Sequence, residues 1–323
     1  MADPVKVSII IPVKPGGAVS ALGELRAADY PADALEILVA EGCSPSRQRN
    51  MAAAAAAGEI LYFLDDDSLV TPGFLRTAVR HYGDPVVAAV GGPSLTPAAD
   101  TPLQHAFGLA FASRAGGGGM RNRYRRTGGV RATCDRELIL CNLSFRRDVF
   151  LEQGGFDERL YPNEENELME RLRRRGGVLI HDPDLAVQRS QRPTLKAFCR
   201  QLFSYGRGRG EQTALSGVIR PITFIPSLFL LYLVLLPFVR KPVFYLPLFF
   251  YLLMAVAVAL CAAVRTRRFR AAILLPAVLL LFHICYGAGL VRGLVMTGGR
   301  KRGSRDSEVT IRKVKEFGGP LMG

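Results

Sequence analysis

A short apolar run, Ile60–Leu64, leads directly into three consecutive aspartates, Asp65, Asp66 and Asp67. Five apolar residues in a row predict a strand buried on both faces, which is typical of a mostly parallel sheet. Open α/β sheets bind ligands at the carboxyl ends of such strands. Because side chains alternate along an extended chain, we expect Asp65 and Asp67 on one side and Asp66 on the other. Two hard oxygen ligands on one side suit a divalent metal; a solvated acidic turn is the alternative that this stretch leaves open.

Strand and helix segments alternate on both sides of this run. Apolar and β-branched residues predict further strands at 7–13, 35–40, 85–92 and 137–146. Alanine-rich or proline-initiated segments predict helices at 47–58 and 71–82. This alternation predicts an α/β fold in which helices flank a mostly parallel sheet.

The composition is basic, with 42 Lys and Arg against 28 Asp and Glu, a formal net charge of +14. Such a charge suits nucleic acid, an anionic membrane surface or phosphorylated substrates. Much of the excess flanks apolar segments or lies in two Gly/Arg-rich stretches, so we expect no nucleic-acid partner. The six cysteines form no C-x-x-C pair, which argues against a zinc site or a disulfide framework and fits a reducing compartment. The N-terminus lacks the pattern of a signal peptide.

Three apolar stretches of near membrane-spanning length lie at 222–239, 243–264 and 271–291. They predict a soluble domain over 1–215, membrane-embedded helices over 216–297 and a basic tail over 298–323. The first stretch is slightly short and contains two prolines, so it can be re-entrant. Three full spans would put the tail on the far side of the membrane, whereas two spans plus a re-entrant segment would keep it on the near side. Charge counting leaves both topologies open.

In the segment 113–133, four consecutive glycines are followed by five arginines, and the segment shows no apolar periodicity. It is predicted to be a flexible basic loop. Two interpretations remain open, a solvated surface loop and a lid that grips phosphates or lipid headgroups.

Several segments together resemble one known family. The strand at 7–13, the helix start at 46–50, Phe63–Asp67, Gly154–Glu158 and the pair Glu164-Glu165 are similar to family 2 inverting glycosyltransferases with the GT-A fold. These segments occur in the same order as in the family, and the resemblance covers roughly the first two thirds of the chain. The apolar tail resembles that of bacterial membrane-anchored members, including those that build exopolysaccharide on a polyprenyl carrier.

The resemblance implies a donor site at the strand ends. Asp67 would ligate Mg²⁺ or Mn²⁺ bound to the diphosphate of a nucleotide-sugar, with UDP-sugar the expected donor. Asp65 would contact the ribose or join the metal ligands. The complete implied donor-binding set is Pro12, Val13, Lys14, Glu41, Arg47, Asn50, Asp65 and Asp66.

Glu164 and Glu165 stand where the family has an E-D pair whose second carboxylate is the base. The resemblance therefore implies Glu165 as the catalytic base with Glu164 beside it. Inversion at an anomeric carbon needs a carboxylate to take the proton of the acceptor hydroxyl. It also needs positive charge near the departing diphosphate. A helix N-terminus lowers the pKa of such a base and burial raises it, and the sequence leaves open which effect dominates.

The chain departs from the family pattern at several positions. Glu165 stands where Asp is usual, Lys14 replaces the common Asn, and Arg189 or Gln191 lies where the family often has His. The chain has no Trp, so the Q-x-x-R-W motif of processive members is absent and we expect a single-addition transferase. The residues expected to grip the acceptor or diphosphate are Asn142, Arg200, Gln201, Arg207 and Arg209.

These observations predict a metal-dependent inverting glycosyltransferase that transfers a sugar to a lipid-linked, polyprenyl-type or membrane-proximal acceptor. The expected location is a bacterial inner membrane, with several membrane passes and the catalytic domain facing the cytoplasm. Two alternatives remain open. A sugar-phosphate nucleotidyltransferase also carries strand-end aspartates, and a non-catalytic membrane scaffold could bind nucleotide without turnover.

Overall fold

The computed structural model describes residues 3–296 and 308–322, and the chain forms two compact units that are interleaved in sequence. The first contains the described parts of 1–95, 122–189 and 302–323, and the second those of 96–121 and 190–301. These units differ from the three consecutive segments expected from the sequence. The start of the expected basic tail, 298–307, lies outside the described residues.

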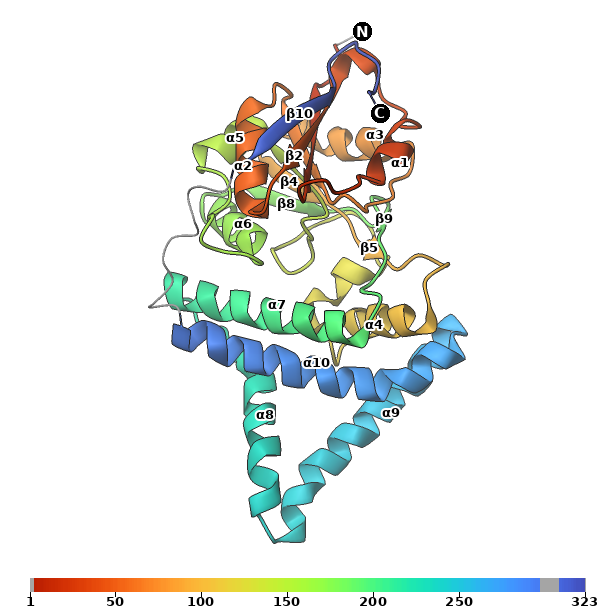
Figure 1. Ribbon diagram of the computed structural model, residues 1–323, viewed down its shortest axis with the longest axis vertical. Helices are drawn as coiled ribbons and strands as arrows, with labels where there is room; N and C mark the ends of the chain where they lie inside the picture. The colour runs from red at the N-terminus through yellow and green to blue at the C-terminus, as the bar shows by residue number, and fades with distance from the viewer. Residues whose placement is uncertain (1–2, 297–307, 323) are drawn as a thin grey trace. The chain divides into compact units, whose positions relative to one another are not determined.

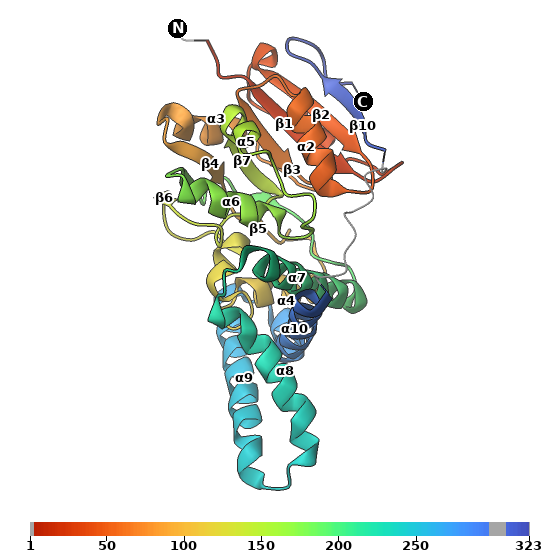
Figure 2. The same cartoon turned by 90° about the vertical axis from the view of Figure 1, so that its left-hand side faces the viewer.

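The first unit is built on one large sheet with strand order β10-β2-β1-β3-β7-β4-β8-β6 (Figures 1 and 2). Five strands run in one direction, and β10, β7 and β6 run against them. The α/β fold with a mostly parallel sheet is therefore confirmed. The strands of the described residues are β1 (Val7–Val13), β2 (Leu35–Glu41), β3 (Ile60–Leu64), β4 (Val87–Gly91), β6 (Arg131–Ala132), β7 (Asn142–Arg146), β8 (Val178–His181) and β10 (Thr310–Lys315), and β5 (Ser94–Leu95) pairs separately with β9 (Val187–Gln188).

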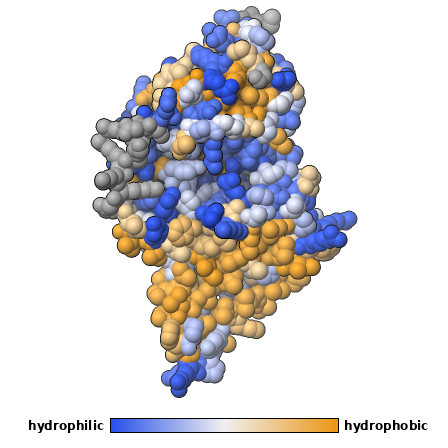
Figure 3. Space-filling view, in the orientation of Figure 1, coloured by the Kyte–Doolittle hydropathy of each residue, from blue (hydrophilic) through white to orange (hydrophobic). Residues whose placement is uncertain are grey.

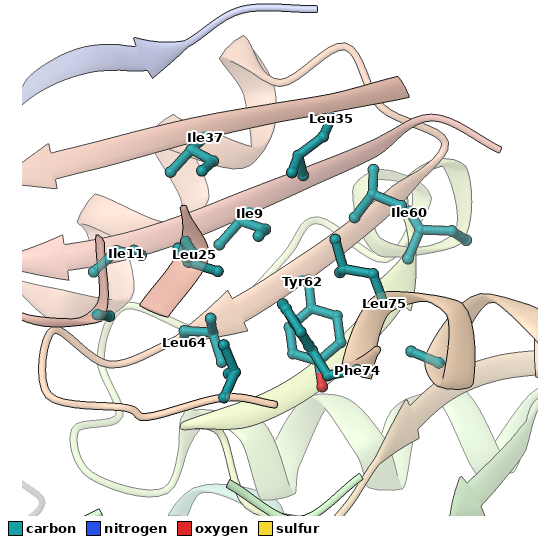
Figure 4. Close-up of a cluster of buried hydrophobic side chains, with 14 of the residues drawn as sticks. Ile9, Ile11, Leu25, Leu35, Ile37, Ile60, Tyr62, Leu64, Phe74 and Leu75 are labelled. Atoms are coloured by element: carbon teal, nitrogen blue, oxygen red, sulfur yellow. The ribbon is translucent and has the colours of Figure 1, made fainter. Parts of the chain in front are cut away.

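Helices cover both faces of this sheet, because its central strands are apolar on both sides. Ile9 and Tyr62 point to one face, where the ring of Tyr62 packs edge-on against that of Phe74 (Figure 4). Ile10 and Phe63 belong to the core of the opposite face. The helices over the first face are α1 (Ala21–Leu25) and α3 (Phe74–Val79), and those over the second are α2 (Pro45–Ala55), α5 (Arg147–Glu152) and α6 (Glu164–Arg174). Short 3₁₀ turns lie at η1 (Ala32–Ala34), η2 (Arg80–Gly83) and η3 (Gly118–Tyr124).

Two strands differ from the sequence-based expectation. The strand expected at 137–146 begins only at Asn142, because 137–141 form turns that bury Leu138 and Cys141. The edge strand β10 was not anticipated, since its sequence TIRKVK is mostly charged and exposed. It pairs antiparallel with β2, and Lys313 Nζ lies 3.2 Å from Glu36 Oε2.

The second unit is helical, and its described residues include three helices long and apolar enough to cross a membrane, at 221–238, 242–266 and 269–296. This number agrees with the expectation from sequence. Apolar side chains cover much of the surface of this unit over α8, α9 and α10 (Figure 3). The helices are α4 (Pro102–Ala112), α7 (Leu195–Ser216), α8 (Ile225–Leu235), α9 (Leu246–Thr266) and α10 (Phe269–Met296), with 3₁₀ turns η4 (Pro221–Phe224), η5 (Leu236–Phe238) and η6 (Pro242–Tyr245).

Helices α7 and α10 lie side by side along a seam of glycines (Figures 1 and 2). A Cβ atom on Gly206 would overlap the carbonyl oxygen of Tyr286, and one on Gly289 would overlap that of Phe203. Only glycine therefore allows the two backbones to approach this closely.

Candidate functional site

The carboxyl ends of β1, β2 and β3 meet at one edge of the sheet. Val13 pairs with Glu41 across the parallel β1–β2 ladder. The side chain of Gln48, on α2, donates to the carbonyl oxygens of Val13 at 2.8 Å and Ala40 at 2.6 Å. The Gly16 amide donates to Glu41 Oε1 at 3.0 Å, so the loop that contains Lys14 is held against the end of β2. The predicted residues Pro12, Val13, Lys14 and Glu41 thus lie at one sheet edge.

Asp65 and Asp67 converge on a single guanidinium, that of Arg189. Arg189 Nη2 lies 3.1 Å from Asp65 Oδ2, and Arg189 Nε donates to Asp67 Oδ1 at 2.6 Å. The backbone of Arg189 follows β9, and its amide donates to the Leu95 carbonyl at 2.9 Å. Burial is the largest single effect and disfavours the charged guanidinium, but the neighbouring groups, with Asp65 first and Asp67 among them, together hold the pKa of Arg189 well above its usual value.

Asp66 makes different contacts from its two neighbours. Its carbonyl oxygen accepts from the Ala21 amide and the Ser20 hydroxyl, both at 3.0 Å. Burial raises the pKa of the Asp66 carboxyl, and the charges of Asp67 and Asp65 raise it further. Arg189 binds the first and third aspartates, as expected, but the chain here is not extended: β3 ends at Leu64, and the Ser68 amide closes a turn on the Asp65 carbonyl at 3.1 Å.

A second arginine, Arg49 on α2, connects Asp65 to the glutamate pair. Arg49 Nη2 lies 3.0 Å from Asp65 Oδ1, and Arg49 Nη1 lies 3.1 Å from Glu164 Oε1. The side chains of Arg49 and Glu164 are only 6% and 2% exposed, so water screens this pair weakly. Burial, followed by the neighbouring Glu165, raises the pKa of Glu164 to about 7, although Arg49 acts in the opposite direction.

Glu165 lies in the first turn of α6, directly after Glu164, and contacts a different arginine. Arg123 Nη1 lies 3.5 Å from Glu165 Oε1, and the Asn166 side chain donates to the same oxygen at 3.3 Å. Arg123 belongs to the basic segment 113–133 and is itself buried, where it also donates to the Asp135 carbonyl and to Asn166 Oδ1. This part of the segment is therefore not a solvated loop.

Three other predicted residues of the first unit also have defined places. Asn50 holds the turn before α6, because its Oδ1 accepts from the Phe156 amide at 2.9 Å and its Nδ2 donates to the Phe156 carbonyl at 2.8 Å. Asn142 is fully buried at the start of β7, accepts from the Tyr62 hydroxyl at 2.6 Å and donates to the Leu185 carbonyl. Arg47 is half-buried in the first turn of α2.

The four predicted acceptor or diphosphate residues of the second unit all lie on α7. Gln201 donates to the Tyr205 hydroxyl at 2.7 Å. Arg207 Nε lies 3.6 Å from Glu211 Oε1, and the buried Arg209 donates to Gln212 Oε1 at 2.7 Å. Arg200 is exposed. Helix α7 therefore supplies a row of charged and polar groups within this unit.

The site fits a divalent cation through two carboxylates. Among the described residues, no group of three or more His, Cys, Asp or Glu side chains is arranged to hold a metal. Asp65 and Asp67 nevertheless direct oxygens toward one cationic group, Arg189. Such a pair suits a hard ion that takes its remaining ligands from a diphosphate and water. Arg189 would have to give up these oxygens when the ion binds.

The sequence assigns no role to Arg49, places Arg123 only within the basic segment that could form a phosphate-gripping lid, and places Arg189 only near the position where the family often has His. Each is a buried or partly buried arginine whose carboxylate partner is remote in sequence. The separation is 115 residues for Arg49 and Glu164, and 122 for Arg189 and Asp67. Only for Arg49 does the sequence offer a signal. Arg49 lies on the alanine-rich helix α2, and a charged residue on the sheet-facing side of a helix requires a partner.

Comparisons with known proteins are consistent with this geometry. Over 164 residues the chain is 28% identical to the pre-mycofactocin glycosyltransferase of two Mycobacterium tuberculosis strains, an alignment that covers 50% of this chain and 33% of the relative. The match thus spans about a third of the length of these curated relatives.

Solved structures give a similar result. The mannosyltransferase PcManGT from Pyrobaculum calidifontis, solved with GDP-Man and Mn²⁺, superposes with a TM-score of 0.55 at 18% identity over 91% of this chain and 88% of that one. TarS 1–349 of S. aureus with UDP aligns with a TM-score of 0.44 at 13% identity over 98% of each chain. The first of these supports a GT-A-type fold.

The model of glycosyl transferase family group 2 matches residues 60–284, which is more than half of the chain. The matched region includes the aspartate motif after β3, the glutamate pair at the start of α6 and the first two apolar helices. The chain therefore belongs to glycosyl transferase family group 2 and is a glycosyltransferase of the GT-A type.

Proposed function

We propose that this chain transfers a sugar, with inversion, from a UDP-sugar or a related nucleotide-sugar to a lipid-linked or membrane-proximal acceptor in a reaction that requires Mg²⁺ or Mn²⁺. One observation carries the proposal. Arg49 joins the strand-end carboxylate Asp65 to the glutamate pair, so a diphosphate-binding group and a candidate base belong to one connected polar cluster. Single-displacement glycosyl transfer needs both groups near the reacting sugar, one to hold the departing diphosphate and one to take the proton of the acceptor.

On the donor side, Asp67 and Asp65 would hold the cation, and Arg189 lies beside them as a further positive group. When bound, the cation supplies positive charge to the departing diphosphate. Lys14 and Glu41, at the ends of β1 and β2, lie at the edge where parallel sheets bind nucleotides.

On the acceptor side, Glu165 would take the proton of the attacking hydroxyl while the glycosyl bond to the diphosphate breaks on the opposite face of the sugar. Its contacts with Arg123 and Asn166 fix the carboxylate in place. Glu164 is a positioning residue in this scheme, because its oxygen is occupied by Arg49.

The membrane-associated half of the proposal rests on the apolar helices of the second unit. Their lengths suit a bilayer, so an acceptor that resides in the membrane, such as a polyprenyl-linked glycan, is the fitting substrate class. A bacterial inner-membrane location with the catalytic unit in the cytoplasm, where nucleotide-sugars are made, completes the proposal.

The decisive experiment compares Glu165→Gln and Asp67→Asn with Glu170→Gln, a matched change on the same helix that breaks the ion pair with Arg174. We expect both site variants of the purified full chain to lose transfer by at least about a hundredfold, the lower end for losing a general base. In thermal shift with a panel of UDP-, GDP- and dTDP-sugars and Mn²⁺, Glu165→Gln should retain donor stabilisation, whereas Asp67→Asn should lose its Mn²⁺-dependent part.

Full turnover by both site variants would reject the proposal. Pyrophosphate release from a nucleoside triphosphate and a sugar phosphate would instead favour a nucleotidyltransferase. Tight nucleotide binding without transfer across the donor panel would favour a scaffold.

A further inference from the structure

Helix α10 differs from the other two apolar helices in how much of it is covered by protein. Of the most apolar stretch of α10, 39% is buried by other parts of the protein. The corresponding share is 6% for the helical stretch that contains α8 and 11% for that of α9. Composition and length alone make all three candidates for crossing a membrane. The difference in burial indicates that α8 and α9 expose their surface to lipid, whereas α10 is largely occupied by neighbouring helices.

One neighbour of α10 is α7, which cannot lie in the hydrocarbon core. Gly206 and Gly210 of α7 meet the backbone of α10 near Tyr286 and Leu290. Helix α7 carries Lys196, Arg200, Arg207, Arg209 and Glu211 along its length. Such a density of charge is costly inside a bilayer. The part of α10 that lies along α7 is therefore held outside the bilayer core.

A further neighbour of α10, besides α7 and the two helices α8 and α9, is the segment around α4, whose helix is too short to cross. Its 11 residues extend about 16 Å, roughly half of the hydrocarbon thickness of about 30 Å. The rings of Phe111 and Phe282 meet at 5.3 Å, and His283 Nε2 lies 3.1 Å from the Ala115 carbonyl oxygen. At the first turn of α10, Arg268 contacts His105 of α4. Both the beginning and the middle of α10 are thus joined to a non-spanning segment.

The path of the chain gives an independent indication. The chain leaves the first unit after Arg189 and returns to it at β10, where Thr310–Lys315 pairs with β2. A chain that leaves and re-enters a unit on one side of a membrane must cross that membrane an even number of times. Three full crossings are incompatible with this pairing.

We infer that α8 and α9 cross the membrane as a hairpin, and that α10 lies with α7 and α4 in the interface on the side of the catalytic unit. The hairpin is closed toward its tip, where the Tyr232 hydroxyl donates to the Phe244 carbonyl at 2.8 Å. Closer to α10, Phe229 stacks on Tyr251 at 4.5 Å, and the Tyr251 hydroxyl lies 2.9 Å from His283 Nδ1 of α10.

The distribution of charge agrees with this topology. Arg240 and Lys241 alone lie at the hairpin tip, on the far side. The arginines at the α9–α10 corner and near the end of α10 all lie on the near side, as the positive-inside rule favours for a cytoplasmic catalytic unit. They are Arg265, Arg267, Arg268, Arg270 and Arg292.

Cysteine labelling tests the inference on the full chain. Arg270 and Arg292 are exposed near opposite ends of α10. They are 22 residues apart, which corresponds to about 33 Å along the helix. A membrane-impermeant maleimide is applied to spheroplasts and to inside-out vesicles that contain Arg270→Cys, Arg292→Cys or Arg240→Cys, and labelling above that of the unsubstituted chain is scored. We expect Arg270→Cys and Arg292→Cys to react from the same face, and Arg240→Cys from the other. Reaction of Arg270→Cys and Arg292→Cys from opposite faces would overturn the inference.

A second measurement does not depend on thiol reactivity. Alkaline phosphatase, which is active only outside the cytoplasm, is either fused after Gly323 or inserted between Arg240 and Lys241 of the full chain. Activity of the insertion alone supports the hairpin topology, and activity of the C-terminal fusion overturns it. Neither result depends on sugar transfer, so this inference and the proposed function can fail separately.

Discussion

Asp65 and Glu164 are held by the two terminal nitrogens of one guanidinium, that of Arg49, at 3.0 and 3.1 Å. One carboxylate follows the central strand β3 and the other begins α6. The arginine thereby fixes the distance between a group that would bind the donor and the helix that presents the candidate base.

Replacing Arg49 tests this link. Lysine keeps the charge but is a point donor that cannot bridge two carboxylates in a planar fork, so Arg49→Lys should lower kcat more than it raises the KM for the donor. Arg49→Ala leaves Glu164 buried without its partner and should cost about 3–5 kcal/mol of unfolding free energy at pH 8. Chemical denaturation and initial-rate kinetics measure the two effects. The control is Arg76→Ala, which removes an exposed pair with Asp29 and should leave both quantities unchanged. Normal kcat in Arg49→Lys would contradict the positioning role.

Arg189 should compete with metal for Asp65 and Asp67. In the absence of donor, Arg189→Gln removes the guanidinium from these oxygens. Because a hydrogen bond to a charged group contributes roughly 1.5–3 kcal/mol, we expect Mn²⁺ affinity to rise about tenfold or more, as measured by calorimetry. Arg159→Gln, which breaks an exposed pair with Asp157, is the matched control. Unchanged Mn²⁺ affinity in Arg189→Gln would show that the ion does not use these oxygens.

The buried carboxyl of Glu164 should make stability depend on pH. Its pKa is raised from 4.5 to about 7, chiefly by burial, so between these values the folded chain binds more protons than the unfolded chain. Stability should therefore fall as pH rises through this range. Glutamine at this position cannot titrate, so the Tm of the wild type should drop relative to that of Glu164→Gln between pH 5 and pH 8. A constant difference in Tm across this range would contradict the raised pKa.

The glycine seam between α7 and α10 should not tolerate a side chain. A methyl group at position 289 would overlap the Phe203 carbonyl, so Gly289→Ala should destabilise the second unit by about 1–3 kcal/mol, the usual cost of overpacking. Thermal unfolding in detergent measures the effect. The corresponding change at Gly23, where a Cβ would meet nothing within 4 Å, serves as the control. Equal Tm values for the two variants would show that the helices separate in solution.

The sequence predicted those features that depend on neighbouring residues. The continuous apolar runs of β1 and β3 specify strands buried on both faces, and the alternation of strand and helix specifies the sheet class. The expectation that Asp65 and Asp67 face one group agrees with their shared contact to Arg189, although a turn after β3, and not an extended strand, brings them together. These predictions need no knowledge of distant contacts.

The remaining features depend on pairings between residues that are far apart in sequence. Arg49, Arg123 and Arg189 have no local pattern that distinguishes them from solvated arginines, and only the fold brings each to its carboxylate. The strand β10 lacks the alternating pattern of a half-buried strand, since Val314 and Lys315 are its only buried residues, and its formation depends on the free edge of β2. The proposed topology with two membrane crossings depends on this pairing.

The position of β10 also sets an order for the assembly of the protein. The ribosome makes β1 and β2 first, but the strand that covers their edge is made only after α8, α9 and α10. During synthesis β2 therefore presents an unpaired edge, a surface that promotes aggregation. The sheet is completed only after the three apolar helices have been synthesised. A polypeptide that ends before β10 would lack the strand that covers β2, so a completed sheet edge identifies a chain whose apolar helices have all been made.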